Sequence, residues 1–137
     1  MSNFRLVYEQ ENGTLAVVIP APGVSVEEAA KAVPQGKSYK VVSEDSLPTD
    51  RVFRTAWKLE GDEVVEDQEK SLELSHKYRR LLREQEFIPL DDKIAKRLPG
   101  WESVETDRQK IRDKYAEIQT ELENATSVEE YKNILGI

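Results

Sequence analysis

The stretch LPTDRVFRTAWKLEG (residues 47–61) lies where the sequence changes from a strand-like to a helix-like pattern. It places two arginines, a phenylalanine and a tryptophan close together after a proline. A strand here would put four side chains on one face: Phe53, Thr55, Trp57 and Leu59. A short helical turn over residues 49–56 is the alternative, and periodicity does not decide between the two.

Two roles are open for the aromatic residues of this stretch. Phe53 and Trp57 are spaced to pack together in a core, either on a strand or on a helical turn. In the functional interpretation, Trp57 and Arg54 form a binding hot spot, because tryptophan and arginine are enriched at such positions in protein interfaces. We therefore include Arg54 and Trp57 among the predicted interaction residues.

Residues 4–43 predict a small β-rich unit with one short helix. The strand-like segments FRLVY and LAVVI flank Asn12-Gly13, which is a strong hairpin signal because both residues tolerate positive φ. LAVVI (residues 15–19) is apolar on both faces and is predicted to be the central strand. Ser25 and Glu28 have capping-box spacing at the start of a short helix. SYKVVS (residues 38–43) predicts a third strand.

After Gly61 the pattern becomes helical. Residues 66–86 are rich in Glu, Lys, Arg and Leu, and their apolar positions are spaced four and three residues apart: Leu74, Tyr78 and Leu81. The proline in FIPLDDKIAKRLPG (residues 87–100) predicts a break before a second, short helix. Residues 103–124 form the clearest helix. The capping-box spacing of Thr126 and Glu129 predicts a last, short helix.

The helix over residues 103–124 carries one apolar seam: Val104, Ile111, Tyr115, Ile118 and Leu122. This seam needs the 66–86 helix as an antiparallel partner, or another chain. Two helices of this size bury too little apolar surface to be stable alone. The rest of the seam must dock on the β-rich unit, through Trp57 and Trp101, or on a second chain, and we expect the second chain. The predicted interaction residues are therefore the five seam residues together with Leu74, Tyr78 and Leu81.

The predicted fold class is α+β, in three parts. Residues 1–60 form a small β-rich unit with a hairpin, a helix and a third strand, and with a fourth strand if residues 51–60 are extended. Residues 61–69 form an acidic hinge. Residues 70–137 form a helical hairpin followed by a short terminal helix.

The charge distribution limits the kinds of partner. The chain carries a net charge of −7, and residues 61–137 contain 13 basic and 19 acidic side chains against 7 and 8 in residues 1–60. This argues against nonspecific nucleic-acid binding, which needs a basic face. No apolar run approaches the roughly 20 residues that span a bilayer, and the start MSNFRLVYEQ lacks the layout of a signal peptide. We expect no nucleic-acid or membrane partner and a cytoplasmic location.

No residue pattern indicates catalysis. The sequence contains no cysteine, which excludes disulfides, thiolate chemistry and cysteine-based zinc sites. His76 is the only histidine, and its neighbours do not complete a metal site. Adjacent carboxylates such as Asp91 and Asp92 diverge by roughly 100° on a helix. We predict a non-enzymatic protein with no catalytic, cofactor-binding or metal-binding residues.

An arginine-rich segment, KYRRLLRE (residues 77–84), leaves two interpretations open. Arg79, Arg80 and Arg83 on one helix would form a patch for RNA or phosphate. The flanking glutamates favour ion pairs within the helix instead.

Three elements occur in order in the N-terminal half: PAPG (residues 20–23), VPQGKSYKVV (residues 33–42) and LPTDRVFRTAW (residues 47–57). With them the chain resembles a group of small tailed-bacteriophage proteins that share PAPG, VPxGxxYxxV and LPxDRxFRxAW. The arginine-rich helix and RQKIRD (residues 108–113) are similar to the helical tails of phage tail-fibre assembly chaperones.

The resemblance implies a phage assembly or interaction protein, in the first place a tail or tail-fibre assembly chaperone. Its partner would be a tail or tail-fibre structural protein or another virion subunit, and a homo-oligomer is the other assembly considered. The location would be the host cytoplasm, or the virion if the protein is instead a minor accessory component of the particle. A third function, suggested by charge alone, is an acidic inhibitor of a host enzyme that mimics nucleic acid.

Overall fold

The computed structural model describes residues 3–137 and has the predicted α+β fold, with 54% helix and 16% strand. It divides into two compact units, Met1–Asp67 and Gln68–Ile137, each of which has its own contacts. The boundary lies inside the segment that the sequence predicted to be a hinge. No helix in the described residues combines the length and the apolar character needed to cross a membrane.

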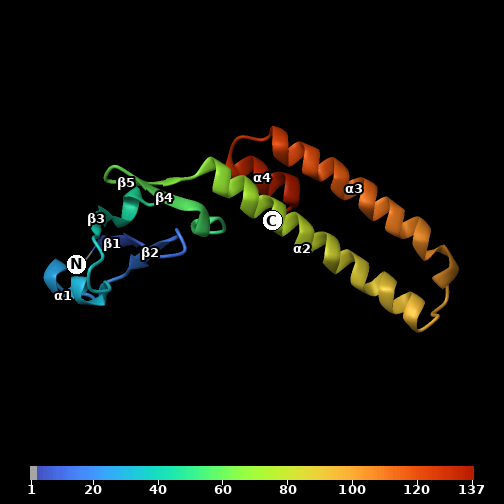
Figure 1. Ribbon diagram of the computed structural model, residues 1–137, viewed down its shortest axis with the longest axis horizontal. Coiled ribbons are helices and arrows are strands. Elements are labelled where there is room, and N and C mark those ends of the chain that lie inside the picture. The colour runs from blue at the N-terminus through green and yellow to red at the C-terminus, as the bar shows by residue number, and fades with distance from the viewer. Residues whose placement is uncertain (1–2) are drawn as a thin grey trace. The chain divides into compact units, whose positions relative to one another are not determined.

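The N-terminal unit is built on a three-stranded antiparallel sheet (Figure 1). Its strands are β1 (Phe4–Glu9), β2 (Leu15–Val18) and β3 (Lys40–Ser43), in the order β2-β1-β3. The Asn12-Gly13 hairpin is confirmed, and Gly13 has a φ of 83°. The prediction that residues 15–19 form the central strand is wrong. β1 is central because β3, which follows much later in the chain, pairs with its other edge.

The helix between β2 and β3 is short. α1 (Val26–Ala29) continues into a 3-10 turn at Ala30–Ala32. The Ser25 cap is confirmed, because its hydroxyl oxygen accepts a hydrogen bond from the backbone N–H of Glu28 at 3.2 Å.

The stretch LPTDRVFRTAWKLEG (residues 47–61) contains both a helical turn and a strand, the two structures that the sequence left open. A 3-10 turn at Arg54–Ala56 leads into β4 (Trp57–Glu60), which pairs with β5 (Glu63–Glu66) in a second, two-stranded sheet. A strand starting at residue 51 is therefore wrong, and Thr55 is exposed. Within the segment predicted to be a hinge, Gly61, with a φ of 66°, turns the chain into a hairpin whose second strand buries Val64.

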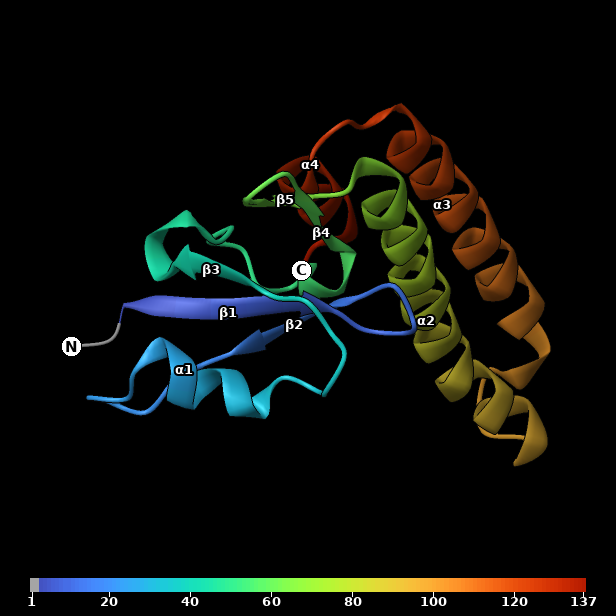
Figure 2. The ribbon, with the colours of Figure 1, turned by 60° about the vertical axis from the view of Figure 1, so that its left-hand side comes forward.

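The core of the N-terminal unit lies between the two sheets. It consists of five buried side chains, one or more from each sheet and from the loop between them: Val7, Val42, Leu47, Trp57 and Val64. Figure 2 shows the β4–β5 hairpin on one side of the three-stranded sheet and α1 on the other. The side chains of β1 alternate accordingly, with Val7 in this core and Leu6 buried on the opposite face.

The C-terminal unit confirms the predicted helical hairpin with a short terminal helix. Its helices are α2 (Gln68–Ala95), α3 (Val104–Asn124) and α4 (Val128–Leu135), with a 3-10 turn at Trp101–Ser103 before α3 (Figure 1). α2 and α3 run antiparallel, as two ion pairs between them show: Lys114 with Glu86 at 3.0 Å and Arg108 with Asp91.

The predicted break at Pro89 is wrong, because α2 continues through it. Proline lacks the N–H of one helical hydrogen bond, which costs about 3 kcal/mol in a helix interior. The exposed Pro89 is flanked by Glu86 and Asp91, whose ion pairs to α3 hold the helix on both sides of it. Packing against α3 thus offsets the local preference for a break.

α4 covers the part of the seam that the sequence assigned to a second chain. It buries Val128, Tyr131 and Leu135 within the C-terminal unit and contacts both α2 and α3. Its cap lies one residue later than predicted, at Ser127, whose hydroxyl accepts from the N–H of Glu130 at 3.2 Å. The Glu130 carboxylate accepts from the N–H of Thr126 at 3.1 Å, which completes a variant of the capping box.

The interior face of α2 also differs from the expected apolar line. Its buried positions are Ser71, Ser75 and Arg79, four residues apart, and Ser75 Oγ donates to the Ser71 carbonyl at 2.8 Å. Leu74 and Tyr78 are half-buried and Leu81 is exposed. Small serines permit close packing of helices, so the larger apolar residues of α3 and α4 fill this interface.

Leu122→Ala and Leu81→Ala form a matched pair that tests this assignment. Leu122 is fully buried and Leu81 is 50% exposed. Leu122→Ala should lower the free energy of unfolding of the helical unit by about 2–5 kcal/mol, because it leaves a cavity. Leu81→Ala should change it by about 0.5 kcal/mol or less. Urea denaturation followed by far-UV circular dichroism measures both, and equal effects would contradict the packing described here.

Candidate functional site

The N-terminal unit contains a cleft of about 520 Å³, a size typical of ligand sites. One wall is β2, from which Leu15, Ala16 and Val17 line the cleft together with Ile19 beyond the strand. The other wall is the segment from Leu47 to Trp57, which contributes Arg51, Arg54 and Thr55. Arg5, Gln10, Thr14 and Glu44 complete the lining.

The cleft reaches the backbone of β2. Side chains of Leu15 and Val17 point to the face of the sheet that carries the core, whereas Ala16 points to the opposite face. A cleft lined by Ala16 as well as by its neighbours therefore contacts the main chain of the strand. In the sheet order β2-β1-β3, β2 has one edge that pairs with no strand in the described chain.

Two turn and loop hydrogen bonds establish which backbone groups of β1 face each neighbour. The N–H of Gln10 donates to the Thr14 carbonyl on the β2 side, and the N–H of Glu44 donates to the Asn3 carbonyl on the β3 side, both at 2.8 Å. Bonded residues alternate along an antiparallel pair. Even-numbered residues of β1 therefore bond to β2 and odd-numbered residues bond to β3.

The same alternation applies to β2. Its Ala16 lies opposite Tyr8 and its Val18 lies opposite Leu6, so these two residues bond inward to β1. The N–H and C=O groups of Leu15 and Val17 consequently point outward, to the free edge. These residues also line the cleft.

Three arginines contribute to the cleft, and they differ in their surroundings. Arg5 is ion-paired with Glu44 at 3.1 Å. The Arg51 guanidinium lies 5.2 Å from the centre of the Trp57 ring, in a cation–π contact. The exposed Arg54 and Arg51 have no carboxylate within ion-pair distance among residues 3–137. The cleft therefore carries two positive charges that the described chain does not neutralise.

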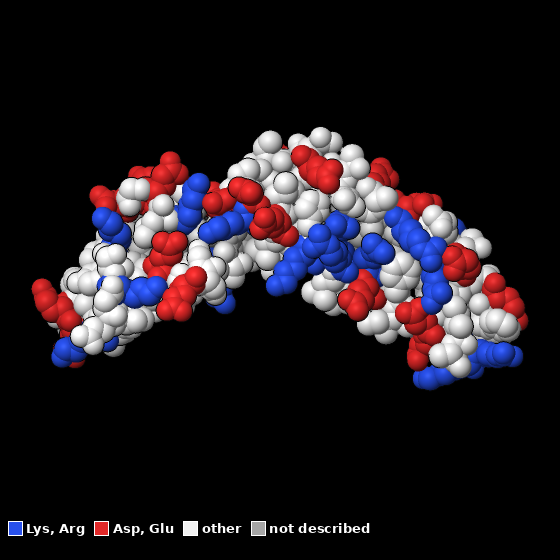
Figure 3. Space-filling model, viewed as in Figure 1, with Lys and Arg blue, Asp and Glu red and all other residues white. Residues whose placement is uncertain are grey.

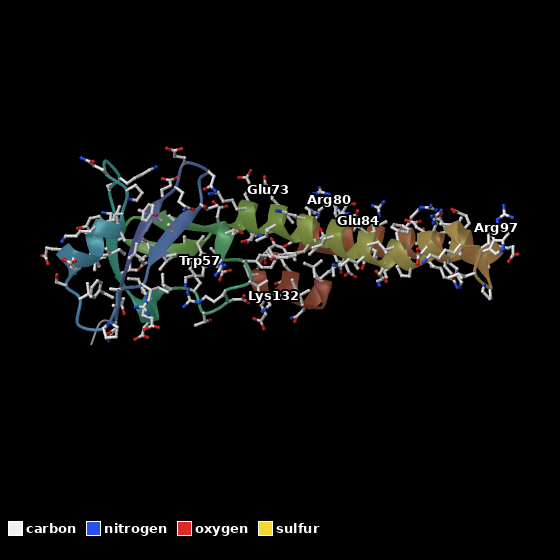
Figure 4. All side chains as sticks on the ribbon, turned by 90° about the horizontal axis from the view of Figure 1, so that it is seen from below. Trp57, Glu73, Arg80, Glu84, Arg97 and Lys132 are labelled. Carbon is white, nitrogen blue, oxygen red and sulfur yellow. The ribbon has the colours of Figure 1, made fainter. Side chains whose placement is uncertain are left out.

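Trp57 is the buried aromatic residue in the lining of the cleft. Its side chain is 2% exposed and packs with the core of the N-terminal unit. Figure 4 shows the position of Trp57 in this unit. Its indole N–H is buried and has no hydrogen-bond acceptor in the described part of the chain. Glu66, which lies opposite Trp57 in the β4–β5 ladder, has a pKa raised by burial and by the nearby Asp50 carboxylate.

The structure separates the other predicted interaction residues. Val104, Tyr115 and Leu122 are buried in the helical unit, and Ile111 and Ile118 are half-buried on the same helix. Leu74 and Tyr78 are half-buried on α2, so of the predicted helical residues Leu81 has the most open side chain. Arg54 and Trp57 do come together with the cleft, one at its exposed wall and one at its floor.

A further exposed apolar side chain, which was not predicted from the sequence, is that of Ile88, seven residues after Leu81 on α2 and 60% exposed. This spacing places the two side chains on one side of the helix. Figure 3 shows lysine and arginine side chains gathered over the middle of α2, and Figure 4 shows Glu73 and Arg80 projecting from one side of it. The outer surface of α2 is thus mixed in charge with two exposed apolar side chains.

The three arginines of α2 do not form one patch. Arg79 is 6% exposed, and its Nε donates to Nδ1 of His76 at 3.2 Å. Arg83 lies 5.6 Å from the centre of the Phe87 ring. Burial, with a contribution from Arg79, lowers the pKa of His76, which agrees with a neutral imidazole that accepts this bond. His76 is half-buried rather than exposed.

Tyr115 forms the clearest electrostatic site of the helical unit. Burial, together with a hydrogen bond to the Glu86 carboxylate, raises its pKa to about 12. The bond from Tyr115 and the ion pair with Lys114 lower the pKa of Glu86. This arrangement of Tyr115, Glu86 and Lys114 links α2 to α3.

No group of three or more potential metal ligands occurs among residues 3–137. Asp91 pairs with Arg108 and Asp92 pairs with Lys96, so these adjacent carboxylates point to different partners. In comparisons with known proteins, the chain matches no protein-family model, no curated protein and no solved structure.

Tyr115→Phe tests the link between α2 and α3. The pKa of Tyr115 is about 12 in the folded chain, against an ordinary tyrosine value of 10 that applies when the chain is unfolded. The Tyr115 hydroxyl therefore contributes fully to stability below pH 10, and this contribution is lost as the pH rises toward 12. Between these values the urea midpoint should fall more steeply in the wild type than in the variant. Ultraviolet titration should show one tyrosine ionising near pH 12 that the variant lacks.

Tyr39→Phe, at an exposed position of the other unit, is the control. Its urea midpoint should follow the wild type over the whole pH range. Parallel loss of stability in the wild type and in Tyr115→Phe would show that the Tyr115–Glu86 bond is not formed.

Proposed function

We propose that the chain is a non-enzymatic protein-binding component of a tailed bacteriophage, a tail or tail-fibre assembly chaperone. In this role it holds a structural subunit of the tail before assembly. The cleft of the N-terminal unit carries the proposal, because it joins an open strand edge to two exposed arginine side chains, Arg51 and Arg54. Arginine is one of the residue types enriched among those that contribute most to protein interfaces.

The phage assignment is supported by where the resembling elements lie. Leu47, Arg51, Arg54 and Trp57 are all fixed positions of the LPxDRxFRxAW element, and all four line the cleft. A sequence element that served only the core would not be expected to specify two exposed arginines. We therefore propose that the phage proteins that this chain resembles have the same cleft.

The chemistry of the cleft favours binding over catalysis. Its one carboxylate, Glu44, is ion-paired with Arg5. The other lining groups are aliphatic side chains, an amide, hydroxyls, arginines and the indole. A general base or nucleophile needs a partner that activates it, and this lining offers no such pair.

The outer surface of α2 is the second proposed contact. Leu81 and Ile88 are exposed apolar residues on one side of the helix, with charged neighbours around them. An apolar pair of this kind matches the contact of a helix with a groove on a partner. A tail subunit held at both surfaces would be shielded from aggregation until it is assembled.

Co-expression with the tail and tail-fibre subunits of the phage tests the function. The wild type should increase the soluble yield of one subunit and co-purify with it. Leu81→Asp combined with Ile88→Asp should reduce the yield of this complex several-fold, because two charges would enter its apolar contact. Ala116→Asp combined with Thr120→Asp, at exposed positions of α3, is the matched control and should leave the yield unchanged.

Mass spectrometry of purified particles separates the chaperone from a minor virion component. A chaperone should be missing from mature particles, whereas an accessory protein would be found at a fixed copy number. Failure of every tail subunit to co-purify, together with presence in the particle, would overturn the chaperone proposal.

A further inference from the structure

We infer that the cleft binds an extended acidic segment of the partner by adding it as a strand to the free edge of β2. This inference rests on the proposed protein-binding function and names the kind of segment that the cleft recognises. The segment would carry a carboxylate, from an Asp or Glu side chain or from a chain terminus, that reaches Arg51 and Arg54.

The free edge supplies the main-chain part of the recognition. Leu15 and Val17 direct their N–H and C=O groups outward, and both residues line the cleft. An added strand would satisfy these groups in the same way that β1 satisfies those of Ala16 and Val18. Backbone pairing of this kind is independent of sequence, so it requires only that the partner be extended.

Arg51 and Arg54 supply the preference for negative charge. Neither side chain has a carboxylate within ion-pair distance in the described residues, although the whole chain has a net charge of −7. The cation–π contact with Trp57 holds the Arg51 guanidinium beside the cleft. Bonds from arginine to a carboxylate are charge-assisted and are stronger than bonds between neutral groups.

Leu15, Val17 and Ile19 supply an apolar preference. The side chains of Leu15 and Val17 lie on the same face of the sheet, and Ile19, the residue after β2, is 71% exposed. An added strand places every second side chain on this face. The preferred segment should therefore alternate apolar and polar residues and carry its carboxylate near one end.

The open edge of β3 is the alternative place for an added strand, and it differs from the edge of β2 in its charge. β3 also has an outer edge that pairs with no strand in the described chain, and Val41 on it is 49% exposed. The hollow beside it is lined by Asn3, Phe4, Val41, Val42 and Ser43, and it contains no charged side chain. An acidic strand should therefore choose β2 over β3.

The test uses the full-length protein and fluorescent six-residue peptides of alternating valine and threonine. One peptide ends in a free carboxylate, a second is amidated with a terminal Glu, a third is amidated and neutral, and a fourth is amidated with a terminal Lys. Fluorescence anisotropy should show that at least one of the first two binds about tenfold or more tightly than the third and fourth. The first two peptides distinguish a chain terminus from an acidic side chain.

Arg51→Ala combined with Arg54→Ala should remove this difference between acidic and neutral peptides. Lys31→Ala combined with Lys37→Ala changes the net charge equally outside the cleft and should preserve it. N-methylation of single peptide bonds in the tighter acidic peptide provides a test on the wild-type protein. Binding should be lost at every second position only, because alternate N–H groups of an added strand face β2.

Several results would overturn strand addition at β2. They are equal affinity for all four peptides, no detectable binding of any peptide, equal effects of the two double variants, and N-methyl effects without a period of two. If a tail subunit co-purifies although the peptides do not bind, the strand addition fails and the protein-binding function stands. If the peptides bind and no tail subunit does, the assembly function fails and the site stands.

Discussion

β1 divides its backbone hydrogen bonds between two neighbours, and the rest of the N-terminal unit depends on this division. Its even-numbered residues bond to β2 and its odd-numbered residues bond to β3. β1 is thereby fully paired, while β2 and β3 each keep one open edge. Side-chain alternation on the same strands directs Val7 and Val42 to the core with Trp57. Pairing and packing are thus determined by one register.

The apolar seam of α3 is covered within the helical unit by α2 and α4. Tyr131 and Leu135 of α4 supply buried surface that two helices alone would lack, and the hydroxyl of Tyr131 donates to the Ala125 carbonyl at 3.3 Å. The buried seam residues are consequently unavailable to another chain. Leu81 and Ile88 stay exposed on the outer surface of α2, and this is the surface that we propose as the second contact.

Local features were predictable from the sequence because their causes are local. The hairpin follows from Asn12-Gly13, the first helix cap follows from Ser25, and the long α3 follows from its spacing of apolar residues. The continuity of α2 through Pro89 was not predictable, because α2 is held against α3, which lies far away in the sequence. The order of the sheet depends likewise on β3, which can be placed only once the whole unit is folded.

The segment LPTDRVFRTAWKLEG contributes residues both to the core and to the cleft. Leu47 and Trp57 pack in the core, while Arg51 and Arg54 of the same segment line the cleft beside them. The 3-10 turn at Arg54–Ala56 makes this possible, because it changes the direction of the chain before β4 begins. A buried tryptophan under an unpaired arginine holds that charge in place at the cleft. The segment thus anchors the fold through its apolar residues and presents positive charge through its arginines, and neither role could be read from periodicity alone.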